Sequence, residues 1–539
     1  MVVSAQHLAT EAGLQVLAAG GNAVDAAVAV GYALAVTYPA AGNLGGGGFM
    51  TLRLADGRTT FLDFREKAPL VATATMFQDG QGRVVPGLST DSWRAVGVPG
   101  SVAGLEAARE RYGRLPRHAV LAPALALARD GFVLEAGDAA LFAADTPGLA
   151  ADPGARAIFT HDGQPLQVGD RLVQPQLAAS LDLIDASGAE GFAHGRLGQA
   201  IVAASAAGQG ILAAADFSGY AVRELPPVTC SYRGTTVVSA PPPSSGGVTL
   251  CETLNILEGV DLRAAGFHTA MEVHLLVEAM RRAYRDRNQR LGDPAFVDNP
   301  VAHLTDKRYA AALRAGIAAE LATPSASLPA APAVAEGEHT THYAVVDQDG
   351  NAASVTTTLN GWFGAHRVAG DTGILMNNEM DDFTAAPGVP NMFGLVQGDA
   401  NAVAPGKTPL SSMCPTILVR DGRLALVTGS PGGPRIISTV LQVIVDTIDH
   451  GLPLDAAVDA PRIHHQFLPD SIDAEAGALT PAVRATLEAN GYTIRDRPDW
   501  GHAESIMVGG QTFGVSAEAP PELFGVNDRR APAGAAAGR

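Results

Sequence analysis

Apolar and polar positions predict a helix-rich opening followed by a hairpin. Residues 6–19 and 22–37 repeat Ala, Leu and Val with helical character, and Gly20-Gly21 separates the two runs. Residues 49–54 then alternate apolar and polar side chains, and Gly57 turns the chain into a second strand at 59–66. The opening therefore predicts two helices and a β-hairpin in sequence.

A tract rich in Ala, Pro and Ser at 316–339 predicts a flexible linker. Before it, helical runs alternate with loops at 100–135 and 173–205. A Pro/Ser/Gly turn at 240–247 precedes a long helical stretch at 248–292. At the other end of the chain, the Ala- and Gly-rich tail 531–539 predicts a disordered segment.

Two further hairpins are predicted after the linker. The first surrounds Asp349-Gly350, and a three-residue loop with a left-handed Gly350 would place Thr340 opposite Thr358. A two-residue loop would shift that pairing by one residue, so the spacing leaves both registers open. The second hairpin joins 415–419 to 424–428, and a Gly/Pro loop then leads into a helix near 435–450.

Composition narrows the classes of protein. The 539 residues are 47% hydrophobic, which is enough for a large core, and the net charge of −18 argues against nucleic acid or an anionic membrane as partner. The three cysteines are widely spaced and odd in number, which argues against a disulfide framework. The N-terminus lacks a basic region followed by an apolar one, and the apolar run 26–36 is too short to span a bilayer.

Thr340 is the first candidate for chemistry. An N-terminal threonine combines a nucleophilic hydroxyl with a free α-amine that takes its proton. That arrangement requires cleavage of the bond between His339 and Thr340, directly after the linker. The alternative is that a threonine-rich strand simply begins here, since threonine favours strands.

Three other stretches offer polar groups, each with a structural alternative. Gly432 and Gly433 follow a strand, so their backbone N–H groups could stabilise an oxyanion or merely form a turn. Residues 377–382 gather acids and amides that suit a cationic ligand or form a solvated turn. Arg65 ends a strand and can clamp a carboxylate or form a structural ion pair. Ser411 and Ser412 are small donors ahead of another strand.

Metal and nucleotide sites are disfavoured. The acidic stretch 377–382 has no histidine nearby, and the start of a calcium loop at 347–350 lacks its glutamate because Thr358 occupies that position. The glycine run 42–48 has neither the lysine of a phosphate-binding loop nor dinucleotide spacing.

Taken together, these stretches resemble the gamma-glutamyltransferase family of the N-terminal-nucleophile hydrolase superfamily. The resemblance covers nearly the whole chain except the tail, with its motifs in family order: GGNAVDAAVAVGYALAV, GNLGGGGFM, DFREKAP, PPPSSGG, TTHYAVVD, GILMNNEMDDF, PLSSMCPTI, TGSPGG and APRIHHQ. It implies an α+β fold, a four-layer αββα sandwich. It also implies autocleavage into a large subunit, 1–339, and a small subunit, 340–539, which form one intertwined unit.

The resemblance also implies roles for individual residues. Thr340 matches the nucleophile, Thr358 matches the threonine that supports it, and Gly432 and Gly433 match the oxyanion glycines. The remaining matches hold the glutamyl α-centre: Arg65, Ser411 and Ser412 for the carboxylate, and Asn360, Glu379 and Asp382 for the amine. The implied reaction passes a γ-glutamyl group from glutathione or a related donor to water or to an amino acid or peptide, with no metal or organic cofactor.

Some features depart from the family or leave alternatives open. Phe393, in a stretch resembling the family's lid loop (385–403), stands where a gating tyrosine is usual. The resemblance implies a periplasmic or secreted protein, whereas the lack of an export signal in the printed sequence leaves a cytoplasmic one open. The competing interpretations are a cephalosporin or glutaryl acylase, a non-enzymatic binding protein on the same scaffold, and a nucleotide-binding enzyme. The donor is open among glutathione, glutamine and poly-γ-glutamate.

Overall fold

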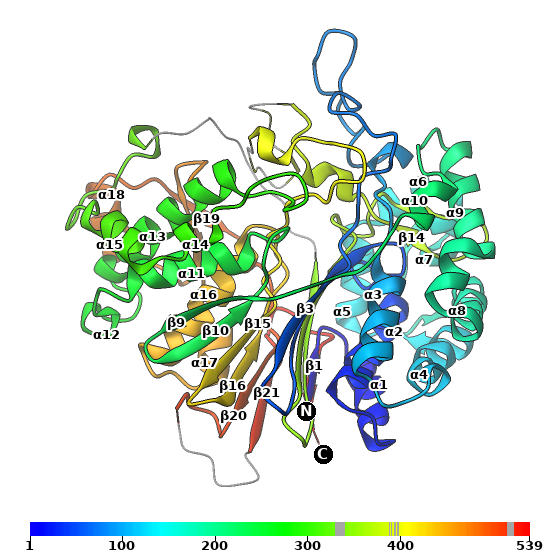
Figure 1. Ribbon diagram of the computed structural model, residues 1–539, viewed down its shortest axis with the longest axis horizontal. Helices are drawn as coiled ribbons and strands as arrows, with labels where there is room; N and C mark the ends of the chain where they lie inside the picture. The colour runs from blue at the N-terminus through cyan, green and yellow to red at the C-terminus, as the bar shows by residue number, and fades with distance from the viewer. Residues whose placement is uncertain are drawn as a thin grey trace.

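Two stacked β-sheets with helices on both outer faces form the molecule (Figure 1). The computed structural model describes residues 1–328, 340–386, 389, 391–392, 395, 398–514 and 522–538. Both termini of the described chain lie side by side at the foot of the sheets. The four-layer αββα prediction is confirmed.

The first sheet combines strands from both sides of the linker. Its seven strands run in the order β22-β1-β11-β12-β2-β3-β8, and each pair is antiparallel. Their bounds are β1 Val2–Ser4, β2 Gly47–Arg53, β3 Thr59–Asp63, β8 Arg223–Leu225, β11 Thr341–Val346, β12 Ala352–Thr358 and β22 Ala535–Ala537. The hairpin β11–β12 is thus inserted between strands that precede the linker, so the two predicted subunits share one sheet.

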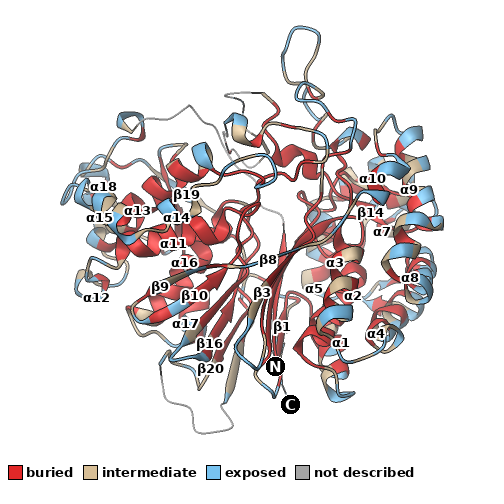
Figure 2. Ribbon diagram, in the orientation of Figure 1, coloured by how far each residue is buried: buried red, intermediate tan, exposed pale blue. Residues whose placement is uncertain are grey.

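The second sheet is six-stranded, in the order β21-β20-β16-β15-β10-β9. Its bounds are β9 Val228–Tyr232, β10 Thr235–Ser239, β15 Thr416–Arg420, β16 Arg423–Thr428, β20 Ser505–Val508 and β21 Leu523–Val526. Apolar side chains from both sheets, among them Val346 and Ile417, form a common buried cluster. Figure 2 shows the resulting burial, with buried strands at the centre and exposure concentrated on the outer helices.

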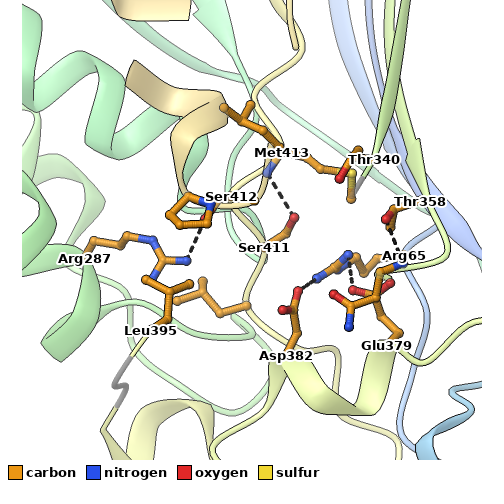
Figure 3. Close-up of a pocket in the computed structure, with 15 residues that line it drawn as sticks. Arg65, Arg287, Thr340, Thr358, Glu379, Asp382, Leu395, Ser411, Ser412 and Met413 are labelled. Atoms are coloured by element: carbon orange, nitrogen blue, oxygen red, sulfur yellow. Dashed lines mark hydrogen bonds and ion pairs between the residues drawn. The ribbon is translucent and has the colours of Figure 1, made fainter. Parts of the chain in front are cut away.

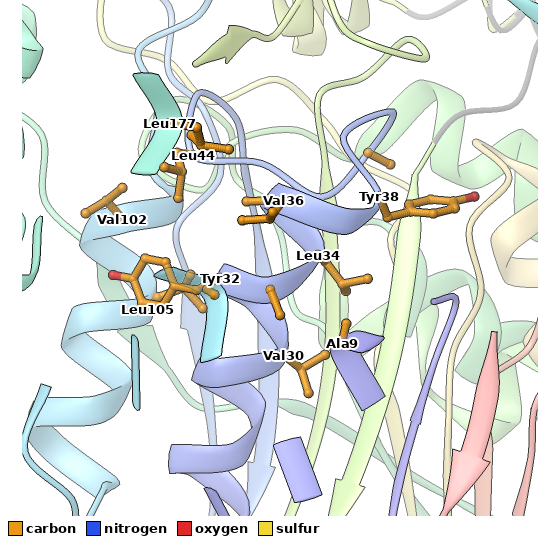
Figure 4. Packing of buried hydrophobic residues seen from close by; sticks show 14 of the residues in the cluster. Ala9, Val30, Tyr32, Leu34, Val36, Tyr38, Leu44, Val102, Leu105 and Leu177 are labelled. Atoms are coloured by element: carbon orange, nitrogen blue, oxygen red, sulfur yellow. The ribbon is translucent and has the colours of Figure 1, made fainter. Parts of the chain in front are cut away.

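The helices that cover the first sheet come mainly from the first 220 residues: α1 His7–Ala18, α2 Ala23–Thr37, α3 Ser101–Tyr112, α4 Arg117–Asp130, α5 Ala136–Ala144, α6 Thr146–Ala151, α7 Pro153–Phe159, α8 Pro175–His194, α9 Arg196–Ala207 and α10 Ala214–Ser218. All of α2 is buried, because it packs between α1, α3, α4 and the strands β11 and β12. Figure 4 shows its side chains Val30, Leu34 and Val36 in this core. A helix apolar on every side is stable only when every side is covered.

The helices of the other outer layer are α11 Gly246–Leu257, α12 Leu262–Ala265, α13 Ala270–Arg290, α14 Val301–Leu304, α15 Lys307–Ala315, α16 Arg435–Ile448, α17 Leu454–Asp459 and α18 Pro481–Ala489. The helical stretch predicted at 248–292 is therefore broken, because α12 and its flanking glycines separate α11 from α13. Short 3-10 turns are η1 Trp93–Ala95, η2 Ser325–Ser327, η3 Glu379–Asp382 and η4 Asp399–Asn401. The minor strands are β4 Phe132–Val133, β5 Thr160–His161, β6 Gln164–Pro165, β7 Arg171–Leu172, β13 Arg367–Val368, β14 Leu375–Met376, β17 Ile463–His464, β18 Ile472–Glu475 and β19 Ile494–Arg497.

The hairpin at the linker's end has the register that places the two threonines together. Its last ladder pair is Val346 with Ala352, and Asp347 N donates to Asn351 O at 3.1 Å. The loop is therefore three residues long, and Gly350 has φ +85°. Since Thr341 pairs with Thr357, the same register carried one residue further sets Thr340 opposite Thr358.

Two expectations from composition were wrong. The tail contains β22, which pairs with β1 through Ser4 and Ala535, so backbone pairing orders a segment whose composition indicated disorder. Cys230 on β9 and Cys251 on α11 form a disulfide. The odd cysteine count misled because the third cysteine, Cys414, is free and buried.

Within the described part of the predicted linker, 316–328, Ser325 anchors the chain to the body of the protein. Ser325 is buried, its N–H donates to Asp470 Oδ2 at 2.7 Å, and its hydroxyl donates to Phe467 O at 2.7 Å. Flexibility of the tract stays a prediction, and residues 329–339, including His339, lie outside the described residues. In the part of the chain that is described, no helix combines the length and apolar character needed to cross a bilayer.

Candidate active site

Thr340 and Thr358 lie side by side at the open end of the β11–β12 hairpin. Thr340 precedes β11 and is 4% exposed, and Thr358 ends β12 and is 2% exposed. Both line one pocket between the sheets and the long loops above them (Figure 3). Asn360 N donates to Thr358 Oγ1 at 2.8 Å, so this hydroxyl is held by the backbone of the next turn.

The glycine run 42–48 has a packing role beside this hairpin. Gly46 lies so close to the strand that a Cβ there would stand 2.1 Å from the carbonyl oxygen of Thr358. Asn43 Nδ2 donates to that same carbonyl at 2.8 Å, and Asn43 Oδ1 accepts from Gly46 N at 3.0 Å. Close backbone approach at Thr358 therefore requires glycine at position 46.

The loop between β16 and α16 brings Gly433 to the pocket. Gly433 lines it with Thr340, whereas Gly432 lies one residue behind the lining. Their φ angles are +129° at Gly432 and +52° at Gly433, a conformation that favours glycine. Their carbonyls accept from Arg435 N and Ile436 N at the start of α16, at 3.0 and 3.2 Å.

Arg65 lies at the centre of a buried acidic cluster. It follows β3, is 1% exposed, and its Nη1 lies 2.6 Å from Glu379 Oε1. Its Nη2 pairs with Asp382, and Glu66 stands at 4.0 Å. The groups predicted to hold a carboxylate and an amine are therefore in direct contact, and three carboxylates share one guanidinium.

The pKa values in this cluster depend on burial and on the excess of carboxylates over guanidinium groups. Burial raises the pKa of Glu66 to about 7, and it raises the pKa of Glu379 well above its usual range. Burial alone would lower the pKa of Arg65, but Glu379 and Asp382 hold it above its ordinary value. The arginine stays charged while the acids compete for it, so the cluster favours an added cation.

The remaining predicted residues also reach the pocket. Asn360 has φ +72°, and its side-chain amide donates to Asn378 O at 3.0 Å. Ser411 Oγ accepts from Met413 N at 3.0 Å, and Ser412 Oγ accepts from the guanidinium of Arg287 at 2.8 Å. The predicted set thus comes together, with Gly432 just behind it.

Sequence reasoning missed Arg287 and Glu66. Arg287 lies on α13 among several arginines, and no pattern distinguishes it from its neighbours. Glu66 follows Arg65 directly in the sequence, so its position next to a predicted binding residue could have identified it as part of the site. Phe393 of the predicted lid lies outside the described residues, although Leu395 from that stretch lines the pocket.

Two stacked sheets with a buried threonine at the start of a central strand define the N-terminal-nucleophile hydrolase class. Within that class the chain belongs to the gamma-glutamyltranspeptidase family, whose model matches residues 9–538. It is 53% identical over its whole length to a glutathione hydrolase proenzyme of Pseudomonas sp. (strain A14), covering 94% of that protein.

Acylases of the same superfamily are similar to this chain as well. The acylase ACY 1 proenzyme of Pseudomonas sp. (strain V22) is 43% identical, over 86% of this chain and 82% of its own length. The crystal structure of a cephalosporin acylase from Bacillus halodurans superposes with a TM-score of 0.85 at 27% identity, covering 98% of this chain and 94% of that one. Family and fold are thus fixed, and the choice of acyl group depends on the pocket.

Proposed function

We propose that this protein is an autoprocessed gamma-glutamyltransferase with glutathione hydrolase activity. The observation that carries the proposal is a single pocket that holds Thr340, Thr358 and the Arg65–Glu379–Asp382 cluster. Its donors are glutathione and related γ-glutamyl compounds, and its acceptors are water, amino acids and peptides.

Thr340 acts after the bond to His339 has been broken. Its free α-amine takes the proton from its own hydroxyl as Oγ attacks the γ-carbonyl carbon of the donor. The backbone N–H groups of Gly432 and Gly433 stabilise the oxyanion, and the hydroxyl of Thr358 supports the nucleophile. The leaving amine takes the proton from the α-ammonium, and a γ-glutamyl ester remains on Thr340.

In the second half-reaction, water or an acceptor amine takes the place of the leaving amine. Water or the amine of an acceptor attacks the ester carbonyl while the α-amine of Thr340 accepts the proton. The ester bond breaks, the α-ammonium returns its proton to Oγ and so restores the threonine hydroxyl, and glutamate or a new γ-glutamyl compound departs. No redox change occurs, so this chemistry needs only side chains, backbone N–H groups and the new N-terminus.

The charge distribution of the pocket favours a glutamyl over a glutaryl donor. A glutamyl α-centre carries an ammonium, which suits Asn360, Glu379 and Asp382, and a carboxylate, which suits Arg65, Ser411 and Ser412. A glutaryl group has no ammonium to pair with these buried acids. The acylase function is the second candidate because of the similar acylases.

Intact mass under denaturing conditions tests the proposal first. We expect two chains, ending at His339 and beginning at Thr340, and a single uncut chain without turnover for Thr340→Ala. A γ-glutamyl anilide should be cleaved and the matching glutaryl anilide should not. Normal cutting of the Thr340→Ala chain would refute the nucleophile assignment, and the opposite anilide preference would favour the acylase.

We also propose that the two subunits remain associated and that the protein is exported. Association is supported by the shared sheet, because β11 pairs with β1 and β12 pairs with β2. Export is supported by the Cys230–Cys251 disulfide, since disulfides persist in oxidising compartments. Cell fractionation with an activity assay checks the location; activity confined to the cytoplasm would contradict it.

A further inference from the structure

Arg287 is a buried arginine whose hydrogen-bond partners are all neutral. It reaches the pocket from α13, is 1% exposed, and lies beside Ser412 in Figure 3. Its guanidinium donates to Ser245 Oγ at 2.9 Å, Asn288 Oδ1 at 2.8 Å and Ser412 Oγ at 2.8 Å. Among the described residues, no carboxylate lies within ion-pair distance of it.

This arrangement is the opposite of the one at Arg65. There one guanidinium faces the carboxylates of Glu66, Glu379 and Asp382. The pocket therefore has an excess of acid around Arg65, whereas Arg287 has no carboxylate in ion-pair contact among the described residues and interacts with Asp382 only at longer range. Burying a charge without a counter-charge is costly. Burial lowers the pKa of Arg287 to about 10, which still leaves it charged at neutral pH.

The contacts of Arg287 also decide what the two serines can do. A serine hydroxyl has one hydrogen to donate and two lone pairs. Because Ser412 Oγ accepts from Arg287, its hydrogen is left to donate elsewhere, and its dipole is aligned by the positive charge. Ser245 accepts from Arg287 and donates to Ser411 O at 2.6 Å, which fixes the backbone of the neighbouring serine.

We infer that Arg287 is a positioning residue for the α-carboxylate of the donor: it orients Ser412 to donate to that carboxylate and supplies the counter-charge. Arg65 cannot supply the whole counter-charge, because its guanidinium is already shared by the carboxylates of Glu379 and Asp382. This inference rests on the proposed function and deepens it. The donor's ammonium then faces the acid-rich side of the pocket and its carboxylate faces the serines.

A pair of donors separates this role from a merely structural one. γ-Glutamyl-p-nitroanilide carries the α-carboxylate, and 4-aminobutyryl-p-nitroanilide is the same donor without it. For Arg287→Gln we expect the KM of the glutamyl donor to rise at least tenfold, and kcat/KM of the aminobutyryl donor to change less than twofold. Arg287→Lys should recover part of the loss because it keeps the charge. Arg285→Gln, on the same helix and paired with Asp286, is the matched control and should match wild type with both donors.

A double-mutant cycle tests whether Arg287 acts through Ser412. In a Ser412→Ala background, Arg287→Gln should cost less than the tenfold expected with Ser412 present, since the orienting contribution is gone and only the counter-charge is lost. Equal losses for both donors, or a full tenfold loss in the Ser412→Ala background, would overturn the inference. The intact mass of each variant shows whether its chain has been cut. If the Arg287→Gln chain stays uncut, Arg287→Lys takes its place in the comparison, and its KM for the glutamyl donor should rise at least threefold.

Failure of the proposed function gives a different result. If wild type turns over neither donor, that function falls, and calorimetric binding then decides the inference. L-Glutamate should bind wild type at least tenfold more tightly than Arg287→Gln, while 4-aminobutyrate binds both equally. Equal binding of L-glutamate to the two proteins would refute the role of Arg287.

Discussion

Glu66 makes the stability of this protein depend on pH. Its carboxyl is fully buried, and its nearest cation is Arg65 at 4.0 Å, which already pairs with Glu379 and Asp382. Burial therefore raises its pKa from 4.5 to about 7. The perturbation that tests this is Glu66→Gln, which replaces the carboxyl by a neutral group of the same shape.

The sign and size of the effect follow from the direction of the shift. A carboxyl with a raised pKa in the folded state holds its proton more tightly when folded, so it stabilises the protein fully below pH 4.5. That stabilisation is lost as pH rises through about 7. A shift of this size corresponds to roughly 3 kcal/mol. For a chain of 539 residues, the unfolding entropy is about 1.1 kcal/mol per degree, so the thermal midpoint should move by about 3 °C.

Thermal unfolding between pH 5 and pH 8 measures this directly. We expect the midpoint of wild type to fall by about 2 °C more than that of Glu66→Gln over this range, because part of the full effect lies below pH 5. Glu11→Gln, an exposed position on α1, controls for the loss of one carboxyl and should follow wild type. Parallel curves for wild type and Glu66→Gln would refute the reasoning, because they would mean that Glu66 ionises alike in both states.

Three further predictions concern binding and stability. Arg65→Lys should raise the KM for a γ-glutamyl donor about tenfold or more with cutting intact, because a single ammonium cannot make both ion pairs; an unchanged KM would count against a role in binding. Cys230→Ser/Cys251→Ser, which opens a loop spanning 21 residues, should lower the thermal midpoint by about 3 °C. It should also abolish any effect of reductant on the midpoint, and a persisting effect would implicate Cys414. Deletion of 531–539 should lower the midpoint and slow cutting, since β1 loses its partner β22 and itself pairs with β11; normal cutting and an unchanged midpoint would contradict this.

Local patterns were sufficient for much of the scaffold. The apolar runs at 6–19 and 22–37 became α1 and α2, and of the two loop lengths left open around Asp349-Gly350 the structure has the three-residue one. These features depend on residues near one another in the chain, where periodicity and turn chemistry are informative. Composition failed where order comes from a distant partner, as at β22, whose partner β1 begins the chain.

The sequence by itself determined the family motifs, the candidate nucleophile and the residue types of the pocket. Only the tertiary structure decided which of these residues form ion pairs with one another. Arg65 and Glu379 are more than 300 positions apart, and their 2.6 Å contact exists because η3 folds over the end of β3. Arg287 was indistinguishable from the other arginines of α13 until packing placed it beside Ser412 without a carboxylate. Burial and pairing are properties of three-dimensional neighbours, so the electrostatics of this pocket could not be derived from spacing along the chain.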